Sequence, residues 1–480
     1  MGGAPGNFLV PIAFLAFPLL VVALFKKFGP RKAIALAFVF GWMFLPVANY
    51  EIFLLKNTKT AVICLSILGS AYLFDKEDMS KFQFNAADIP MILWCTAPFF
   101  SSIANGDGPY DGLASSLAQS EKWGMPYYIA RVYYSDAESV KILSYIIFIG
   151  TLVYIPFCWF ELIMSPQLHR LTYGFHQSSF LQTLRDGGGY RPMVYMDHGL
   201  MTAMWMVLGV FLGIWMLFTG LLPKKIMHIP SLYLLLLLIF TNIMMRSMGA
   251  ISLLIIALLV VYISNKTKTT FLVLILLIVP LLYMFTRTTG IWDGRNLSNA
   301  VSQQYSSERS GSLQFRFDNE TILIRKALQG GFFGWGGYGR SRVYDETGKD
   351  ISVTDGLWII TYGTNGIYGL IVMVIAIQWP LFLFLLRVKP ELWNTKTWGN
   401  SAAMAIFLGI FMIDNLLNAM INPLYMFCGG SLIGILLNSS KVVAVNNDTG
   451  QLESKTEQNR IAHGTRFIPS PRMKTSRFIG

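Results

Sequence analysis

Arginines gather in two polar stretches of the chain, residues 161–198 and 287–355, which separate long apolar runs. Arginine presents a planar fork of donors that suits phosphate, and the glycines of both stretches let the backbone approach a ligand closely. At a membrane surface the phosphates within reach are lipid headgroups and lipid-linked diphosphates. Both stretches therefore predict a phosphate or diphosphate clamp, although each arginine could instead be an ordinary interfacial side chain. The candidate clamp residues are Arg185, Arg191, Arg316 and Arg340.

Three residues in these stretches could move a proton to or from a reacting group: Glu320, Asp355 and His198. Asp355 directly precedes a long apolar run, where membrane and water meet. It could alternatively cap the helix that starts there, as could Thr354. His198 precedes the run that begins at residue 199, and interfacial packing is its alternative role.

Other charged residues can be interpreted without a role in a site. Arg325 and Arg342 are expected to lie on the solvated face of a helix, and Arg246 is expected to mark a tight outer turn between two spans. Asp414 is either functional, as ionisable residues inside membranes usually are, or part of a short outer hairpin. The two remaining loop histidines are expected to be solvated; they are His169 and His176.

The composition excludes several classes of protein. The chain has 480 residues, of which 54% are hydrophobic and only 13% charged, against about 25% charged in soluble domains. The net charge of +12 does not indicate nucleic-acid binding, because basic residues in short loops orient spanning helices. We find no phosphate-loop, dinucleotide or zinc motif, and the four cysteines lack metal-ligand spacing. The sequence therefore predicts neither a cofactor nor a metal.

Apolar runs of membrane length predict an all-α, polytopic bundle that occupies residues 1–438. The polar, mildly basic residues 439–480 predict a disordered cytoplasmic tail. The basic clusters at 26–32, 224–225, 266–268 and 387–389 should also be cytoplasmic. The expected spans are 8–25, 33–50, 59–74, 88–105, 141–160, 199–222, 230–247, 249–264, 270–286, 356–386, 401–418 and 420–438.

Because successive spans cross the membrane in alternating directions, residues 161–198 and 287–355 should lie on the non-cytoplasmic side. Residues 287–355 should form a subdomain of short helices there. Residues 106–111 should lie on that side too, so the polar segment between 111 and 135 has to cross or re-enter the membrane. We expect this segment to pack among other helices and to break at Gly124 and Pro126. The count is then 12–13 spans. No internal repeat is apparent, which argues against a transporter built from matching halves.

Several motifs occur in a fixed order along the chain. Residues 315–320 (FRFDNE) precede 333–336 (FGWG), then 355–358 (DGLW) and 363–369 (GTNGIYG). This order resembles the O-antigen ligase and O-antigen polymerase superfamily, in which an arginine heads a helix that ends in a PLFGWG-like turn. Residues 185–200 resemble that family's other outer loop, so the resemblance covers about residues 185–370. Two departures are Gly-Gly-Phe in place of the proline before FGWG, and Asp355 in place of a family histidine.

The resemblance implies a glycosyltransferase of the bacterial inner membrane, with both polar stretches periplasmic. It would transfer a glycan from a polyprenyl-diphosphate carrier to a sugar hydroxyl on lipid or polysaccharide, in lipopolysaccharide or exopolysaccharide assembly, and could act in an assembly complex. Arg191 and Arg316, with Arg340 or Arg185, would hold the diphosphate. Asp355, Glu320 or His198 would act on the acceptor. The alternatives are a lipid or polysaccharide transporter or channel, and a non-catalytic envelope-assembly component, which the missing histidine favours.

Overall fold

A computed structural model describes residues 6–52, 55–185, 188–304 and 307–439 of the chain. Residues 186–187 of the glycine-rich stretch and the predicted tail beyond residue 439 lie outside the described residues. The chain divides into two units, Met1–Leu436 and Leu437–Gly480, and the sites discussed below belong to the first.

The protein is an all-α, multi-pass membrane protein, as the sequence predicts. Among the described residues, eight helices are long and apolar enough to cross a membrane. All twelve predicted spans coincide with helices. Four of these helices, Pro30–Phe44, Lys59–Phe74, Ser231–Met244 and Pro423–Ser439, have fewer than 18 residues, and the span Ala86–Ala104 reaches 19 residues only with its first, 3-10 turn included. Sheet in the described ranges is limited to two antiparallel hairpins: β1 (Tyr50–Ile52) with β2 (Leu55–Asn57), and β3 (Lys225–Ile226) with β4 (Ile229–Pro230).

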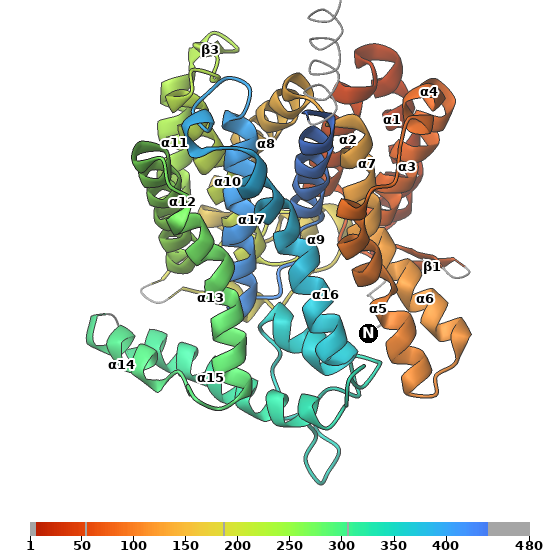
Figure 1. The fold of residues 1–480 in the computed structure, drawn as a ribbon, viewed down its shortest axis with the longest axis vertical. Helices are drawn as coiled ribbons and strands as arrows, with labels where there is room; N and C mark the ends of the chain where they lie inside the picture. The colour runs from red at the N-terminus through yellow and green to blue at the C-terminus, as the bar shows by residue number, and fades with distance from the viewer. Residues whose placement is uncertain (1–5, 53–54, 186–187, 305–306, 440–480) are drawn as a thin grey trace, which may run out of the picture. The chain divides into compact units, whose positions relative to one another are not determined.

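Local sequence signals set the helix boundaries in the first half of the chain (Figure 1). Gly29, with a φ of +74°, and Pro30 separate the first two spans. Asp136 caps α8 by accepting the backbone N–H groups of Glu138 and Ser139. The helices here are α1 (Leu9–Phe28), α2 (Pro30–Phe44), α3 (Lys59–Phe74), α4 (Lys76–Ser80), η1 (Ala86–Asp88), α5 (Ile89–Ala104), α6 (Pro109–Gln119), η2 (Ser120–Gly124), α7 (Met125–Tyr133), α8 (Ala137–Met164), α9 (Leu168–Tyr173) and η3 (Phe180–Thr183).

The second half supplies the interior of the bundle. Side chains of α10 and α17 are almost all buried by the surrounding helices, so these two helices form its core. α16 is kinked at Gly366, whose φ is +67°. The helices here are α10 (Gly199–Phe218), α11 (Ser231–Met244), α12 (Met248–Thr267), α13 (Phe271–Thr288), α14 (Arg295–Gln304), α15 (Ser307–Leu328), α16 (Leu357–Arg387), η4 (Pro390–Leu392), α17 (Gly399–Leu417) and a last helix, Pro423–Ser439.

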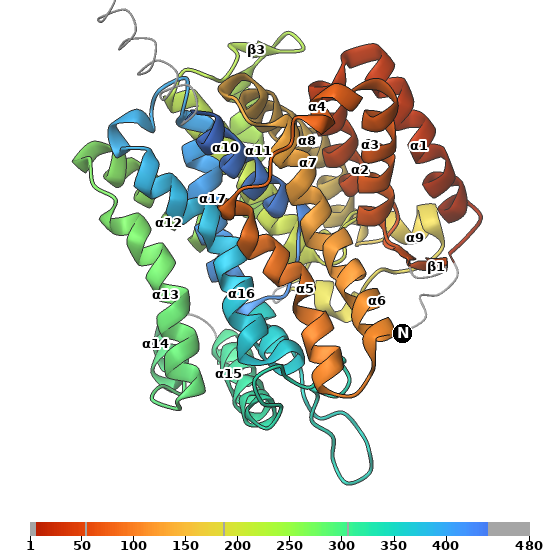
Figure 2. The same cartoon turned by 45° about the vertical axis from the view of Figure 1, so that its right-hand side comes forward.

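The polar segment between 111 and 135 is one continuous helical run, formed by α6, η2 and α7. It leads from the end of the bundle that carries α15 toward the opposite end (Figure 2). The predicted break at Gly124 and Pro126 is wrong, because the chain keeps helical geometry there. Pro126 has no N–H to donate, and the preceding turn is a π-helix in which the Met125 N–H bonds to the Ser120 carbonyl.

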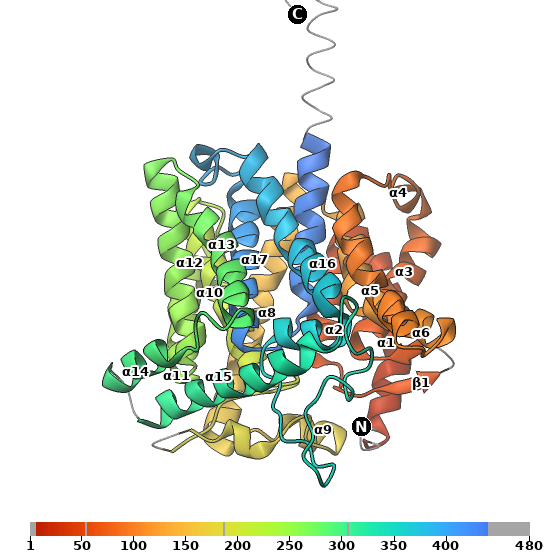
Figure 3. The same cartoon turned by 60° about the horizontal axis from the view of Figure 1, so that its bottom comes forward.

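Loops that are distant in the sequence meet at one end of the bundle. Asn105 donates to the Gly334 carbonyl at 2.8 Å, and Arg246 donates to the Gly188 carbonyl at 2.5 Å. Helices α14 and α15 lie across this end together with α9 (Figure 3). Residues 161–198 and 287–355 therefore share one end, as predicted. The expectation of only short helices in 287–355 is wrong, since α15 has 22 residues.

Candidate functional site

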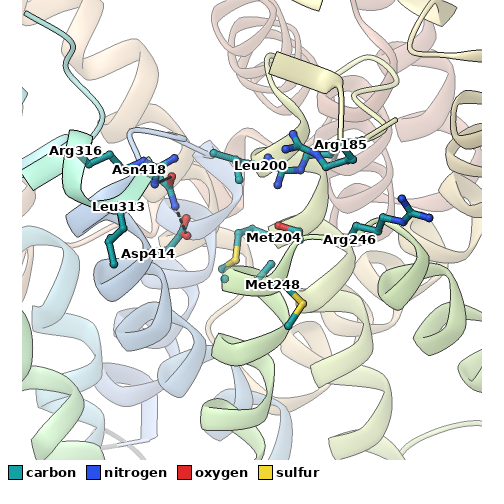
Figure 4. A pocket seen from close by; sticks show the side chains of 13 residues that line it. Arg185, Leu200, Met204, Arg246, Met248, Leu313, Arg316, Asp414 and Asn418 are labelled. Carbon is teal, nitrogen blue, oxygen red and sulfur yellow. Dashed lines mark hydrogen bonds between the residues drawn. The ribbon is translucent and has the colours of Figure 1, made fainter. Parts of the chain in front are cut away.

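Two adjoining cavities lie where these loops meet. The smaller has a volume of about 460 Å³ and is lined by α10, α12, α15 and α17. The larger has a volume of about 720 Å³ and extends toward the 338–355 segment. Both are lined by Arg185, Arg191 and Arg316. Arg316 and Arg185 approach the smaller cavity from opposite sides (Figure 4). The structure thus brings together three of the four predicted clamp arginines, from two loops.

Arg191 lies in a loop that is fixed by backbone contacts on both sides. The buried Glu161 carboxylate accepts the backbone N–H groups of Met193 and Val194 at 2.8 and 2.7 Å. The Arg191 N–H bonds to the Thr183 carbonyl at 2.8 Å. The Arg191 side chain lies against Gly199, where a Cβ atom would approach its Cγ and Cδ to 2.7 Å. A glycine after His198 is therefore required for the Arg191 side chain to lie in this position.

The electrostatics at Arg191 favour an anion. Burial, together with the nearby charges of Arg185 and Arg316, lowers the pKa of Arg191 to about 9. Its Nε is buried and has no hydrogen-bond partner within the described ranges. Crowded like charges with an unused donor are costly unless a counter-charge binds between them. Such a cluster suits a phosphate or diphosphate.

Arg316 projects from α15 and joins both cavities. Its Nε lies 3.5 Å from the Asp355 carboxylate. One terminal nitrogen donates to the Leu417 carbonyl at 3.1 Å and to the Asn418 side chain at 3.3 Å. The Asn418 amide in turn donates to Asp414 at 2.8 Å, as Figure 4 shows. Asp318 and Glu320, the acidic residues nearest to Arg316 on α15, do not pair with it, since their carboxylates accept from Gln314 and Arg287.

Asp355 lines the larger cavity and has about a third of its side chain exposed. The alternative role as a helix cap is wrong for both residues considered. The N-cap of α16 is Gly356, and no side chain caps that helix. The Thr354 hydroxyl instead accepts from Arg342 at 2.8 Å. Asp355 is thus left facing the cavity beside Arg316.

His198 lines the larger cavity but has both ring nitrogens engaged. Its Nδ1 accepts the Leu200 N–H at 3.1 Å and so caps α10. Its Nε2 then carries the proton and donates to Gln182 at 2.9 Å. Burial, together with the charges of nearby arginines, Arg191 first, lowers the pKa of His198 to about 4. The imidazole is therefore neutral at physiological pH, and the structure uses it as a helix cap.

Glu320 and Arg340 lie outside both cavities. Glu320 is 3% exposed and accepts from Tyr283 at 2.7 Å, from Arg287 at 3.1 Å and from Trp358 at 3.3 Å. Its pKa is raised by burial. Arg340 forms a two-fold ion pair with Asp107, in the turn between α5 and α6. Both side chains therefore fasten elements together.

The FGWG motif docks on the kink of α16. Backbone N–H groups of Trp335 and Gly336 donate to the carbonyls of Gly363 and Thr364, each at 2.9 Å. A Cβ atom at Gly334 would collide with the Gly366 backbone. Two of the motifs in the family resemblance, residues 333–336 and 363–369, are thus in direct contact, and their glycines permit that approach.

Several cavity residues were missed or given too little weight by sequence reasoning. Asp414 and Arg246 line the smaller cavity. Lys122, Gln182 and Arg342 line the larger one. The expectation that His169 is solvated is wrong, since it is 1% exposed. A lysine within a helical run that must cross the membrane is the one signal in the sequence that could have drawn attention to Lys122.

No model of a known protein family matches this chain, and no curated protein matches it either. Within the described ranges, no group of three or more His, Cys, Asp or Glu side chains could hold a metal ion.

Proposed function

We propose that this protein is a membrane glycosyltransferase that moves a glycan from a polyprenyl-diphosphate carrier to a sugar hydroxyl. The observation that carries the proposal is the convergence of Arg185, Arg191 and Arg316 on cavities that also present Asp355. Arginine forks bind diphosphate oxygens well, and Asp355 lies beside one of them. The family resemblance of residues 185–370 supports the same assignment.

The arginines would act on the leaving group. In the reaction, the acceptor oxygen forms a bond to the anomeric carbon. The bond from that carbon to the diphosphate oxygen breaks, and its electron pair stays on the diphosphate. Arg191 and Arg316 would stabilise this developing negative charge. Attack opposite the leaving group would invert the anomeric configuration.

Asp355 would act on the acceptor. Its carboxylate can accept the proton of the attacking hydroxyl or orient that hydroxyl. The ion pair with Arg316 would hold the carboxylate in position next to the diphosphate. Asp355 would thus take the place that a histidine has in the resembling family.

The smaller cavity would receive the lipid end of the donor. Its lining combines the arginines with Met204, Met248 and Leu313, so a charged headgroup and an apolar chain could both be accommodated. In this proposal the protein lies in a bacterial inner membrane, with the cavities facing the periplasm and the C-terminus in the cytoplasm.

The test is glycan transfer by purified protein from a polyprenyl-diphosphate-linked oligosaccharide. Arg191→Ala, Arg316→Ala and Asp355→Asn should each lower the rate about 100-fold or more, since loss of one stabilising donor costs about that much. Arg325→Ala is the matched control, because Arg325 is an exposed arginine on the same helix as Arg316. Unchanged transfer in all three variants would exclude this site and favour transport or a non-catalytic role.

A further inference from the structure

Lys122 lies inside the bundle, far from either end of its helical run. Its neighbour Trp123 packs edge-on against Trp94 of α5, with ring centroids 5.5 Å apart. Trp94 precedes the end of α5 by ten residues, which is about 15 Å along a helix. A charged side chain at that depth faces a cavity or a partner in nearly every membrane protein.

The π-helical segment η2 places Lys122 on the cavity wall. Lys122 lines the larger cavity and is exposed there, whereas its neighbours Glu121 and Trp123 are buried at 2% and 1%. A π-turn rotates the residues around it relative to a regular helix, and such turns recur at functional sites. The segment thus directs one ammonium group into the same cavity as Arg191 and Asp355.

The two carboxylates of the larger cavity already have cationic partners. Asp355 pairs with Arg316 at 3.5 Å, and Asp197 lies 3.8 Å from the Lys59 ammonium. Within the described part of the chain, the Lys122 ammonium has no carboxylate within 4 Å. Asp197 is close enough to attract Lys122 as well, but it is shared with Lys59. If the arginines hold a diphosphate, a second anion on the ligand would give Lys122 a partner of its own.

The surroundings of Lys122 indicate what that anion is attached to. The cavity of about 720 Å³ is larger than a diphosphate requires and falls in the range of pockets for drug-sized ligands. Its wall also carries Ser178, Gln182 and Tyr338, whose hydroxyl and amide groups suit sugar hydroxyls. A lysine is a compact point charge and lacks the fork of arginine. Because the proposed function assigns the diphosphate to the arginines, the anion left for this point charge is a single charged group elsewhere on the ligand, such as a carboxylate.

We propose that Lys122 binds the carboxylate of an acidic sugar in the glycan that this protein handles. The inference rests on the proposed function, since it assigns the arginines to the diphosphate. It makes Lys122 a residue that determines specificity between acidic and neutral glycans.

The experiment measures binding to full-length protein in lipid nanodiscs. The probes are a hyaluronan tetrasaccharide, its neutral methyl ester and geranylgeranyl diphosphate. The wild-type protein should bind the acid about tenfold or more tightly than the ester, the usual size of a charge-assisted hydrogen bond. Lys122→Met and Lys122→Gln should abolish this preference and leave diphosphate affinity unchanged. Lys122→Arg should keep most of the preference.

The control is Lys141→Met, which removes an exposed lysine of α8 that pairs with Glu138 and should leave all three affinities unchanged. Equal binding of acid and ester by the wild-type protein would overturn the inference. So would a weaker diphosphate affinity in Lys122→Met, because Lys122 would then belong to the diphosphate site. A different result would contradict the proposed function itself: geranylgeranyl diphosphate would not bind, or Arg191→Ala would not weaken its binding.

Discussion

The arginines of the site differ in how they are held, and this difference has consequences for substitution. The Arg316 guanidinium contacts partners on two sides. Its Nε faces Asp355, and a terminal nitrogen donates to Leu417 and Asn418. Arg191 has a buried Nε that no described residue occupies. A lysine could supply the charge at either position, but it cannot bridge two partners with a rigid plane.

Arg316→Lys should therefore lower glycan transfer about 10- to 100-fold even though the charge is kept. The expected loss corresponds to the bidentate geometry, which a point charge does not reproduce. The measurement is the initial rate of transfer, with Arg325→Lys on the same helix as control. Full activity of Arg316→Lys would show that only charge matters at this position.

His169 should make the protein sensitive to acid. The Val47 N–H donates to its Nε2 at 3.0 Å, and its Nδ1 then donates to the Phe175 carbonyl at 2.9 Å. Burial lowers the pKa of His169 to about 4, from 6.5. As pH falls from about 6.5 toward 4, His169 becomes protonated in the unfolded chain but stays neutral in the folded protein. The free energy of unfolding therefore decreases in that pH range. The loss is at most about 3 kcal/mol for this residue.

The measurement is the thermal midpoint in detergent at pH 7, 6 and 5. The wild-type midpoint should fall more steeply toward acid than that of His169→Gln, which cannot be protonated. His228→Gln, at an exposed position in the β3–β4 hairpin, serves as control. Parallel curves for wild-type protein and His169→Gln would contradict the assignment.

Residue types predicted the cluster of arginines better than they predicted the proton carriers. Arg185, Arg191 and Arg316 could be selected because positive charge in a loop predicted to be non-cytoplasmic needs an explanation. Glu320 and Arg340 look like equally good candidates by residue type, an acid and an arginine in the same stretch. Their side chains are instead paired with Arg287 and Asp107, which belong to other elements. Such long-range pairing leaves no local pattern in a single sequence.

At the scale of elements, a buried ion pair fastens α15 to the bundle. Arg287 of α13 and Glu320 of α15 are 2% and 4% exposed in their side chains. Arg287 also donates to the Phe317 carbonyl at 2.6 Å, one residue after Arg316. The pair therefore fixes the part of α15 that presents Arg316 to the cavities.

Glu320→Ala should destabilise the protein by about 3–5 kcal/mol, because it leaves the Arg287 charge buried without its partner. Lower yield and a lower thermal midpoint in detergent are the expected signs. Glu320→Gln keeps an acceptor for Tyr283 and should have the milder effect, with most transfer activity retained. A well-folded Glu320→Gln protein without activity would instead place Glu320 in the catalytic machinery.

The last helix packs against α7 at two glycines spaced as G-x-x-x-G, Gly430 and Gly434. A Cβ atom at Gly430 would collide with the Tyr127 carbonyl, and one at Gly434 would meet the Arg131 carbonyl at 3.1 Å. Small residues allow helices in membranes to approach this closely. This contact supports the run of helix that carries Lys122.

Gly430→Ala should therefore lower the thermal midpoint by several degrees, since overpacking costs about 1–3 kcal/mol. Gly429→Ala is the matched control one residue away. A Cβ atom there would meet the Pro380 Cγ at 3.4 Å, which is an ordinary contact. Equal midpoints for the two variants would show that the helix pair can separate without cost.

At the scale of the whole molecule, the sequence predicted the helices and the shared end of the two polar stretches. Apolar length is a local property and identifies spans well. The arrangement of helices is not local, since side chains that face lipid and side chains that face protein are both apolar. The central position of α10 and α17, and the cavity beside Lys122, therefore could not be predicted from composition alone.

The basic loops predict the orientation of the whole bundle in the membrane, and cysteine labelling can test this prediction. Glu346 is exposed in the loop on the α15 side, and Met227 is 89% exposed in the β3–β4 hairpin, at the opposite end in Figure 2. The four native cysteines are buried, so background labelling should be low. A membrane-impermeant maleimide applied to cells should label Glu346→Cys, and should label Met227→Cys only after lysis.

This result is expected because Lys224 and Lys225 precede the hairpin tip, and basic residues are retained on the cytoplasmic side. Labelling of Met227→Cys in intact cells, with Glu346→Cys protected, would invert the bundle. The arginine cavities would then face the cytoplasm. In that compartment nucleotide-linked sugars are also available, so the polyprenyl-diphosphate donor would lose its topological support even if the geometry of the site were unchanged.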